Sequence, residues 1–499
     1  MKNFIFFFRR HSFIILIILV LTPLFFINIL KTHDWGGDFA MYIMQGQNIM
    51  EGKSMSETPY IYNPDNPVLG PPAYPVGFPI LLSPVLAIWG ADIHMLTLYI
   101  TFFLFLFAVL SALFLRQAFP GLIVFFMVLV MAYNPWMLSF RTEIMSDLPF
   151  ATLLLGLSLL VFRQENPSWK RIIIVGLLGG FLISIRVAGW VFPMAFALWS
   201  LVLVLRNRKN PVFRTIPCLA KAFAVAGLSW VTYFFLNRVI FPIPLVQGAA
   251  YTGIWSAEPM GITILENITY YIGVLEHFFN PENGRWQFLS LLLRSFVVVF
   301  ALLGLVNRIA RRTGFVELLV LCYLGVIMVY PYRHSGFRFL LPLLPFILYY
   351  FLEGIHDFRL AIRLNYRYRM LAGGMILVVV FFSGTEKAVL RNDYVMPGPQ
   401  EYDSEECWQY IRQNIPQNSV IVFFKPRVLS LYTGRKSLAN AKNQDADSMK
   451  ARFEENDAEY ILIHQAYSDP AIRNYMGRFE QEYFLQWSNQ GFLLYVKNR

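Results

Sequence analysis

The segment from residue 94 to 115 reads HMLTLYITFFLFLFAVLSALFL and contains no Asp, Glu, Lys or Arg. A helix needs about 20 apolar residues to cross the hydrocarbon core of a bilayer, and this segment supplies them. Hydrophobic residues make up 57% of the 499 residues, and charged residues make up only 15%. That composition is too apolar for a soluble protein of this length, so the sequence predicts a polytopic α-helical membrane protein.

Other apolar segments extend the prediction to about eleven membrane spans. They lie at residues 12–30, 120–137, 147–162, 172–186, 188–205, 216–236, 287–306, 315–331, 338–354 and 370–385. The segment from Val76 to Trp89 is also apolar, but it is short and interrupted by proline. We therefore expect it to dip into the membrane as a hairpin arm and not to form a twelfth span.

Basic residues between these spans predict the orientation of the chain. With the N-terminus in the cytoplasm, the inner loops hold 18 Lys and Arg residues, and the outer loops before the C-terminal region hold 8. Cytoplasmic loops retain positive charge, so the chain is expected to end on the outer face. The first span lacks a small-residue cleavage site and is expected to stay as an anchor. The net charge of +11 follows from these loops, so nucleic acid is not an expected partner.

The chain is predicted to change character near residue 386. Residues 1–385 form the membrane domain, with outer loops near 31–75 and 238–285, and residues 386–499 have the composition of a soluble domain. Hydrophobic periodicity in that tail predicts helices near 404–414, 446–455 and after Pro470, and strands near 419–424, 459–464, 483–487 and 492–496. The sequence thus predicts a small C-terminal α/β domain on the outer face.

Within the first outer loop, residues 38–52 show helical spacing of apolar side chains, with Gln45, Gln47 and Asn48 on a polar face. Asp38 occupies the first position of this helix and Gly52 its end. Asp38 could be an N-cap and Gly52 a C-cap. Alternatively, Asp38 is a catalytic base held at the outer edge of the membrane domain.

Other polar residues on the same side also allow two interpretations. Glu143 and Asp147 are four residues apart and could share a helix face, where they would orient an acceptor or a divalent cation. Equally, Asp147 could start a helix while Glu143 pairs with Arg141. His33 beside Asp34 could contact a metal ion or a phosphate, or be ordinarily solvated. No His, Cys or acid cluster with ligand spacing appears in the sequence, which leaves dependence on a divalent cation open and makes no cofactor certain.

These features together resemble one enzyme family. Asp38 with Tyr42 and Gly52, followed by PPAYPVGFP at 71–79, resembles the first outer loop of the GT-C glycosyltransferases of the family 39 type, related to protein O-mannosyltransferases and the aminoarabinose transferase of lipid A. The stretch RTEIMSDLP at 141–149 looks like their second acidic outer loop. Arg186 and the Arg338 to Pro345 segment look like their later motifs, and KPRVLSLYTGR at 425–435 looks like the outer domain of bacterial members.

The resemblance implies an inverting transfer of a sugar from a polyprenyl-phosphate carrier, such as an undecaprenyl lipid of the cell envelope, to a lipid, glycan or protein acceptor. Asp38 is then the expected base for the acceptor hydroxyl. Asp147, Glu143 and Tyr42 are expected to orient the acceptor or a metal ion. The leaving phosphate calls for cations, which the following residues could supply: Arg186, Arg338, Lys425 and Arg427.

Several alternatives remain open from the residues alone. A transporter or flippase of a lipid-linked saccharide would place ionisable residues near the bilayer midplane, often in related halves, whereas these acids gather at the outer edge. A glycan polymerase or ligase would share the carrier and the outward site, and a non-catalytic scaffold would explain only the tail. The expected location is a bacterial inner membrane with the C-terminal domain in the periplasm. An endoplasmic-reticulum membrane facing the lumen has the same topology.

Overall fold

The structure is a computed structural model that describes residues 2–27, 29–64, 66, 69–164, 166–206, 211–243, 260–279, 287–331, 336–362, 374, 397–440 and 444–498. The chain divides into two compact units. The first consists of Met1–Ile29, Thr97–Leu236 and Trp255–Asp393, and the second of Leu30–Leu96, Asn237–Ile254 and Tyr394–Arg499. The predicted span at 370–385 and the predicted boundary near 386 lie outside the described residues, apart from Gly374.

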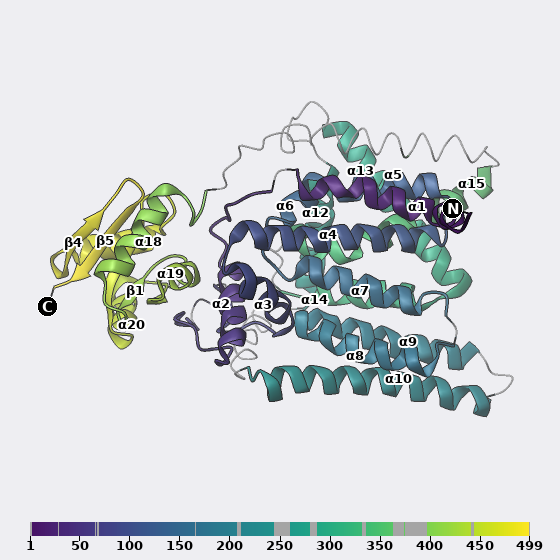
Figure 1. The fold of residues 1–499 in the computed structure, drawn as a ribbon, viewed down its shortest axis with the longest axis horizontal. Helices are drawn as coiled ribbons and strands as arrows, with labels where there is room; N and C mark the ends of the chain where they lie inside the picture. The colour runs from purple at the N-terminus through teal and green to yellow at the C-terminus, as the bar shows by residue number, and fades with distance from the viewer. Residues whose placement is uncertain are drawn as a thin grey trace. The chain divides into compact units, whose positions relative to one another are not determined.

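The first unit is helical (Figure 1). Its elements are α1 (Lys2–Leu21), η1 (Thr22–Phe25), α4 (Ile93–Arg116), α5 (Gly121–Ala132), α6 (Pro135–Phe140), α7 (Asp147–Val161), α8 (Trp169–Ile185), η3 (Val187–Trp190), α9 (Val191–Arg206), α10 (Pro211–Phe234), η4 (Phe235–Ile240), α12 (Met260–Phe279), α13 (Gln287–Arg312), α14 (Phe315–Val329), η6 (Gly336–Phe339), η7 (Leu341–Leu343) and α15 (Leu344–Ile362). α4 and the α10–η4 segment continue into the second unit at one end.

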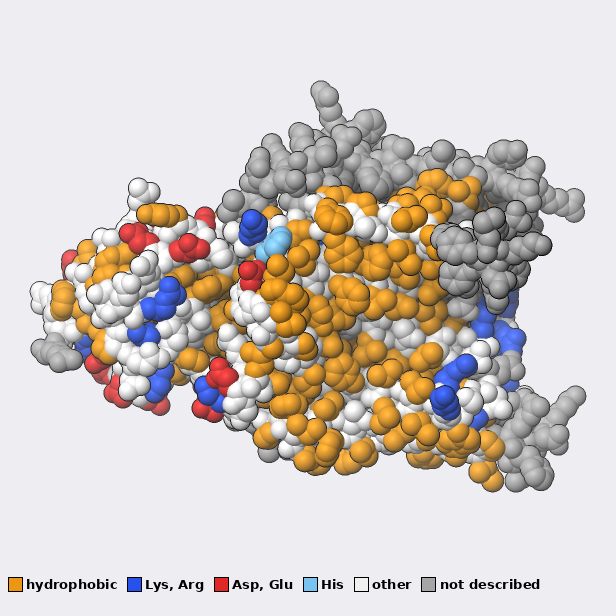
Figure 2. All heavy atoms as spheres, in the orientation of Figure 1, with side chains coloured by type: hydrophobic (Ala, Val, Ile, Leu, Met, Phe, Trp, Pro, Cys, Tyr) orange, Lys and Arg blue, Asp and Glu red, His pale blue; other side chains and the backbone are white. Residues whose placement is uncertain are grey.

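Among the described residues, three helical segments are long and apolar enough to cross a membrane: Ile93–Arg116, Val187–Arg206 and Ile216–Ile240. Five shorter apolar helices accompany them. Many of their large apolar side chains face outward, including Phe223 at 76% and Leu205 at 56% exposed, and hydrophobic side chains dominate the visible face of the helical unit in Figure 2. Such a surface suits lipid and not water, so the chain is a membrane protein.

One region of the first unit was predicted as a loop but forms a helix in the structure. α12 occupies 20 residues of the segment expected as an outer loop near 238–285. The side chain of Asn267 on this helix is fully buried, and its Nδ2 donates to the carbonyls of Met328 and Tyr330 at 2.8 Å each. Polar residues such as Asn267 lower the hydropathy of this segment, which explains why the sequence did not reveal the helix.

The second unit contains α2 (Asp38–Glu51), α3 (Gly77–Trp89) and the C-terminal α/β domain. That domain comprises α18 (Tyr402–Asn414), β1 (Val420–Val422), α19 (Pro426–Thr433), β2 (Lys436–Leu438), α20 (Ala446–Glu455), β3 (Ala458–His464), α21 (Pro470–Arg478), η8 (Glu480–Glu482), β4 (Tyr483–Ser488) and β5 (Phe492–Lys497). The sheet order is β2-β1-β3-β5-β4. β1 lies parallel to β2 and β3, and β5 lies antiparallel to β3 and β4. Every predicted helix and strand of the tail is confirmed, whereas α19 and β2 were not predicted.

The first outer loop is bonded to the edge of this sheet. Tyr60 forms a parallel bridge with Ser437 in β2. Ser437 N–H donates to the Pro59 carbonyl at 3.0 Å, and Ile61 N–H donates to the Ser437 carbonyl at 2.8 Å. Farther along, Asn63 Nδ2 donates to the Ala439 carbonyl at 2.9 Å. These bonds extend the ladder beyond β2, so the loop and the C-terminal domain fold as one unit.

Candidate active site

Asp38 is the first helical residue of α2, directly after Gly37, which occupies the N-cap position. The expectation that Asp38 is itself the N-cap is therefore wrong. A carboxylate in the first turn still interacts favourably with the positive end of the helix dipole. Gly52 ends the helix with φ of 67°, as a left-handed C-cap requires, so that prediction is confirmed.

The Asp38 carboxylate accepts hydrogen bonds from two side chains of the same unit. The Tyr74 hydroxyl donates to Asp38 Oδ1 at 2.6 Å, and Arg427 Nη1 lies at 3.4 Å from the same oxygen. Arg427 Nη1 also donates to the Tyr74 hydroxyl at 2.9 Å. The Asp38 side chain remains 31% exposed. It is therefore a fixed but accessible carboxylate.

The Tyr74 backbone is itself held by a side chain of α2. Gln45 Nε2 donates to the Tyr74 carbonyl at 3.1 Å, and the Tyr74 N–H donates to Gln45 Oε1 at 3.0 Å. Gln45 and Asn48, predicted on the polar face of this helix, are buried, at 0% and 7% exposed. The predicted site residue Tyr42 is buried and stacks on the Tyr74 ring with centroids 4.7 Å apart. These contacts fix where the Tyr74 hydroxyl points.

Arg427 enters this cluster from α19 of the C-terminal domain. Its side chain is 1% exposed, its Nη2 donates to the Pro71 carbonyl at 2.5 Å, and its guanidinium lies 4.9 Å from the Tyr60 ring centroid. Burial alone would lower the pKa of Arg427, but its neighbours Tyr74, Tyr60 and Asp38 outweigh burial and raise it. The group is therefore permanently cationic.

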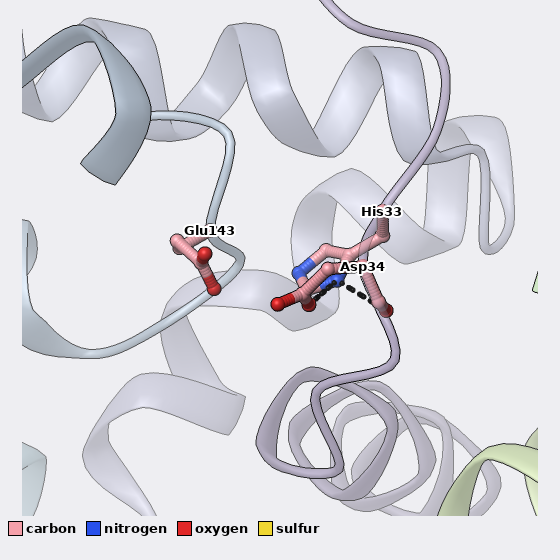
Figure 3. Close-up of side chains that lie close together, drawn as sticks. All are labelled: His33, Asp34 and Glu143. Atoms are coloured by element: carbon pink, nitrogen blue, oxygen red, sulfur yellow. Dashed lines mark hydrogen bonds and ion pairs between the residues drawn. The ribbon is translucent and has the colours of Figure 1, made fainter. Parts of the chain in front are cut away.

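Lys425, immediately before α19, acts electrostatically on a second carboxylate that precedes Asp38. Burial tends to raise the pKa of Asp34, but His33, the Gly36 N–H and Lys425 together lower it. His33 is 2% exposed, and its Nδ1 lies 2.9 Å from Asp34 Oδ1. Figure 3 draws the two side chains side by side. The expectation of an ordinarily solvated His33 is therefore wrong.

A separate cluster lies within the helical unit and joins three predicted residues. Asp147 is the first residue of α7 and is 3% exposed. Arg186, between α8 and η3, donates from Nη1 to Asp147 Oδ1, and Arg338 in η6 donates from Nε to Oδ2 at 2.9 Å. The two arginine side chains are 16% and 21% exposed. Both guanidinium groups therefore bond one carboxylate and stay partly exposed, and guanidinium groups suit an anionic ligand.

Glu143 lies in the turn between α6 and α7 and is half-buried (Figure 3). Because α7 begins at Asp147, Glu143 and Asp147 do not share a helix face, and that expectation is wrong. Arg141 is buried and donates to the carbonyls of Leu24 and Ile27 after α1. The Glu143 backbone N–H donates to the Phe140 carbonyl at 3.2 Å.

Comparison with solved structures identifies the architecture. ArnT from Cupriavidus metallidurans, bound to undecaprenyl phosphate, superposes with a TM-score of 0.59 over 97% of this chain and 98% of that chain at 11% identity. The Archaeoglobus fulgidus oligosaccharyltransferase, tethered to an acceptor peptide with an NVT sequon, gives 0.56 over 99% of this chain and 74% of that chain at 13% identity. The fold is that of the GT-C glycosyltransferases. No protein-family model and no curated protein sequence matches the chain.

The GT-C fold places the predicted residues in two groups, one in each unit. Asp38, Tyr42 and Arg427 meet in the second unit, and Asp147, Arg186 and Arg338 meet in the first. Sequence reasoning missed Tyr74 and Gln45. Tyr74 lies inside the PPAYPVGFP stretch that carried part of the resemblance, and Gln45 is two turns from Asp38 on the same helix, so both signals were present.

Proposed function

We propose that the protein is a glycosyltransferase that moves a sugar from a polyprenyl-phosphate carrier to a hydroxyl acceptor on the outer face of a membrane. The proposal includes about eleven spans, a cytoplasmic N-terminus and a periplasmic C-terminal domain in a bacterial inner membrane. The GT-C fold supports this class of reaction, and the basic residues of the loops support the orientation.

The observation that carries the proposal is the position of Asp38, together with its exposure and its hydrogen-bond partners. It starts a helix in the unit that forms the outer loops, is accessible at 31% and is held by a tyrosine and an arginine. In the proposed step the acceptor oxygen bonds to the anomeric carbon while the bond from that carbon to the carrier phosphate breaks. The acceptor proton passes to the Asp38 carboxylate. Attack opposite the leaving phosphate inverts the anomeric carbon.

The leaving phosphate needs positive charge and no general acid, because a phosphate ester is stable as an anion. Arg186 and Arg338 supply that charge in this proposal, with Lys425 as a further cation. Asp147 is proposed to orient the two guanidinium groups that donate to its carboxylate, and through them the acceptor or a divalent cation. Glu143 and Tyr42 are proposed to orient the acceptor, Glu143 directly or through a divalent cation and Tyr42 through its stacking on Tyr74.

The proposal is tested with purified protein in detergent and a panel of radiolabelled polyprenyl-phosphate sugars. We expect one donor to be consumed, and we expect Asp38→Asn to bind this donor with unchanged affinity while turnover falls by about 10³-fold or more. Binding is measured separately, by retention of the labelled donor on immobilised protein.

Asp447→Asn is the matched control, because Asp447 also lies in the first turn of a helix, α20, where it is 65% exposed and pairs with Arg478. It should leave turnover unchanged. Consumption of no donor, or full activity of Asp38→Asn, would reject the proposal and favour transport of the lipid-linked saccharide.

A further inference from the structure

We infer that the C-terminal domain is a working part of the active site, because its Arg427, acting with Tyr74, positions the Asp38 carboxylate. The inference rests on the proposed function and adds two positioning residues to it. It also moves Arg427 from the donor phosphate, where the sequence placed it, to the base.

The contacts of Arg427 favour this role over binding of a lipid phosphate. Its side chain is 1% exposed, and its guanidinium is engaged by Asp38, Tyr74 and the Pro71 carbonyl. A phosphate ligand on a diffusing lipid requires an arginine with an accessible face. The Asp38 carboxylate, by contrast, is accessible, at 31%.

The surrounding backbone is built to accept the guanidinium. Gly70 has φ of 89°, and a Cβ at this position would lie 2.4 Å from Arg427 Nη2 and 2.7 Å from the Tyr74 hydroxyl. The Gly70 carbonyl also accepts a hydrogen bond from the Tyr60 hydroxyl at 3.2 Å. Only glycine combines this backbone conformation with the space that Arg427 and Tyr74 occupy.

Tyr74 links the arginine to the base. Its hydroxyl accepts from Arg427 and donates to Asp38, so the three groups form a chain in which each hydrogen bond polarises the next. Gln45 fixes the Tyr74 backbone through both atoms of its amide. A hydrogen bond from a fixed hydroxyl turns the carboxylate into one orientation before the acceptor binds.

The same chain brings a hydrogen-bond donor and a positive charge to Asp38. Tyr74 and Arg427 contact Asp38, Tyr42 and Tyr60 pack against these two residues, and Asp34, His33 and Lys425 lie in the flanking segments. The Tyr74 hydroxyl donates to the Asp38 carboxylate and the Arg427 guanidinium lies 3.4 Å from it, and a hydrogen bond and a nearby positive charge each favour the charged form of a carboxylate. Loss of either partner should make Asp38 protonate at a higher pH, so activity should disappear earlier as the pH falls.

The experiment measures kcat and KM from pH 4 to 9 for wild type and three variants. Tyr74→Phe keeps the ring and removes the hydroxyl. We expect it to lower kcat about tenfold with donor KM unchanged, because a hydrogen bond to a charged group is lost. Arg427→Met should move the acidic limb of the kcat profile upward by about one pH unit. Arg427→Lys retains the positive charge, so its acidic limb should lie close to the pH at which the wild-type limb lies.

Arg435→Met is the matched control. Like Arg427, Arg435 is a buried arginine of the C-terminal domain. It follows α19 and donates to the carbonyls of Arg412, Ile415 and Thr433 within that domain. It should lower thermal stability without moving the pH profile. If Tyr74→Phe and Arg427→Met keep the wild-type acidic limb while Asp38→Asn is inactive, the positioning role is rejected and the base assignment survives. If Asp38→Asn is active, the proposed function itself has failed.

Discussion

Arg338 donates from Nε to Oδ2 of Asp147 at 2.9 Å, although 191 residues separate the two in the sequence. Arg186 occupies the other oxygen of the same carboxylate. Both arginines therefore bond the same carboxylate, and their side chains remain partly exposed. This arrangement supports two of the predictions below.

Arg338→Gln should weaken donor binding. The substitution removes one of the two guanidinium groups proposed to bind the phosphate, so we expect the KM for the lipid-phosphate donor to rise about tenfold or more with a smaller change in kcat. Steady-state kinetics over a range of donor concentrations measure both. Arg311→Gln removes an arginine that is 60% exposed and paired with Asp357, and it should leave KM unchanged. Equal effects of the two variants would contradict the assignment.

Asp147→Asn should destabilise the helical unit. Two guanidinium groups would then face each other across a buried amide, and the free energy of unfolding should fall by about 2–4 kcal/mol. Thermal unfolding in detergent measures the change. The double variant Asp147→Asn with Arg338→Gln should lose less than the sum of the two single variants, because it removes the repulsion. Strict additivity would mean that the residues do not interact.

Gly70→Ala should damage activity more than Gly52→Ala, although both glycines have positive φ. A Cβ at Gly52 meets no atom within 4 Å, so that substitution incurs only backbone strain of about 1–2 kcal/mol. At Gly70 the methyl group would also displace Arg427 and Tyr74. We expect similar expression of both variants and loss of turnover only in Gly70→Ala. Equal turnover would show that displacement of the guanidinium has no consequence.

His464 should make the stability of the protein depend on pH. Burial lowers the pKa of His464 to about 4, against an ordinary value of 6.5. The unfolded chain therefore binds more protons between these values, so stability is full above pH 6.5 and falls as the pH drops toward 4. The loss should be on the order of 2–3 kcal/mol. Melting temperatures from pH 7.5 to 4 measure it.

His464→Asn is the variant that isolates this effect. His464 Nδ1 accepts from the backbone N–H groups of Ala466 and Tyr467, at 3.1 and 3.3 Å, and an asparagine oxygen could accept in its place without titrating. The variant should start less stable and should lose less melting temperature on acidification. An unchanged slope would assign the pH dependence to other groups.

Hydrophobic pattern predicted most elements correctly and failed where elements were short or polar. α19 spans 8 residues and begins with proline, and β2 has 3 residues, so neither shows enough periods to be recognised. α12 was predicted as part of a loop because its polar residues lower the hydropathy of the segment. Among the described residues, three helical segments are long and apolar enough to cross a membrane, and the count of about eleven spans stays a prediction.

The site was only partly visible in the sequence because its pairings are long-range. Asp38 and Asp147 were recognisable as acids at helix starts, and both are the first residues of helices. Asp38 and Arg427 are 389 positions apart in the sequence. Their contact depends on the pairing of the first outer loop with the edge of the C-terminal sheet. No local pattern encodes such a contact. The burial of Gln45 likewise depends on the Tyr74 backbone, which the helical periodicity of α2 cannot show.

The bridge between Tyr60 and Ser437 has a practical consequence for handling this protein. β2 is the terminal strand of the sheet, and residues 59–61 cover its outer side. A fragment starting at Pro397 would carry that strand with its N–H and C=O groups unpaired, and such an edge recruits strands from other copies. The C-terminal tail is therefore not expected to be an independent monomeric domain. Expressed alone it should self-associate, and a version joined to residues 30–96 should stay monomeric.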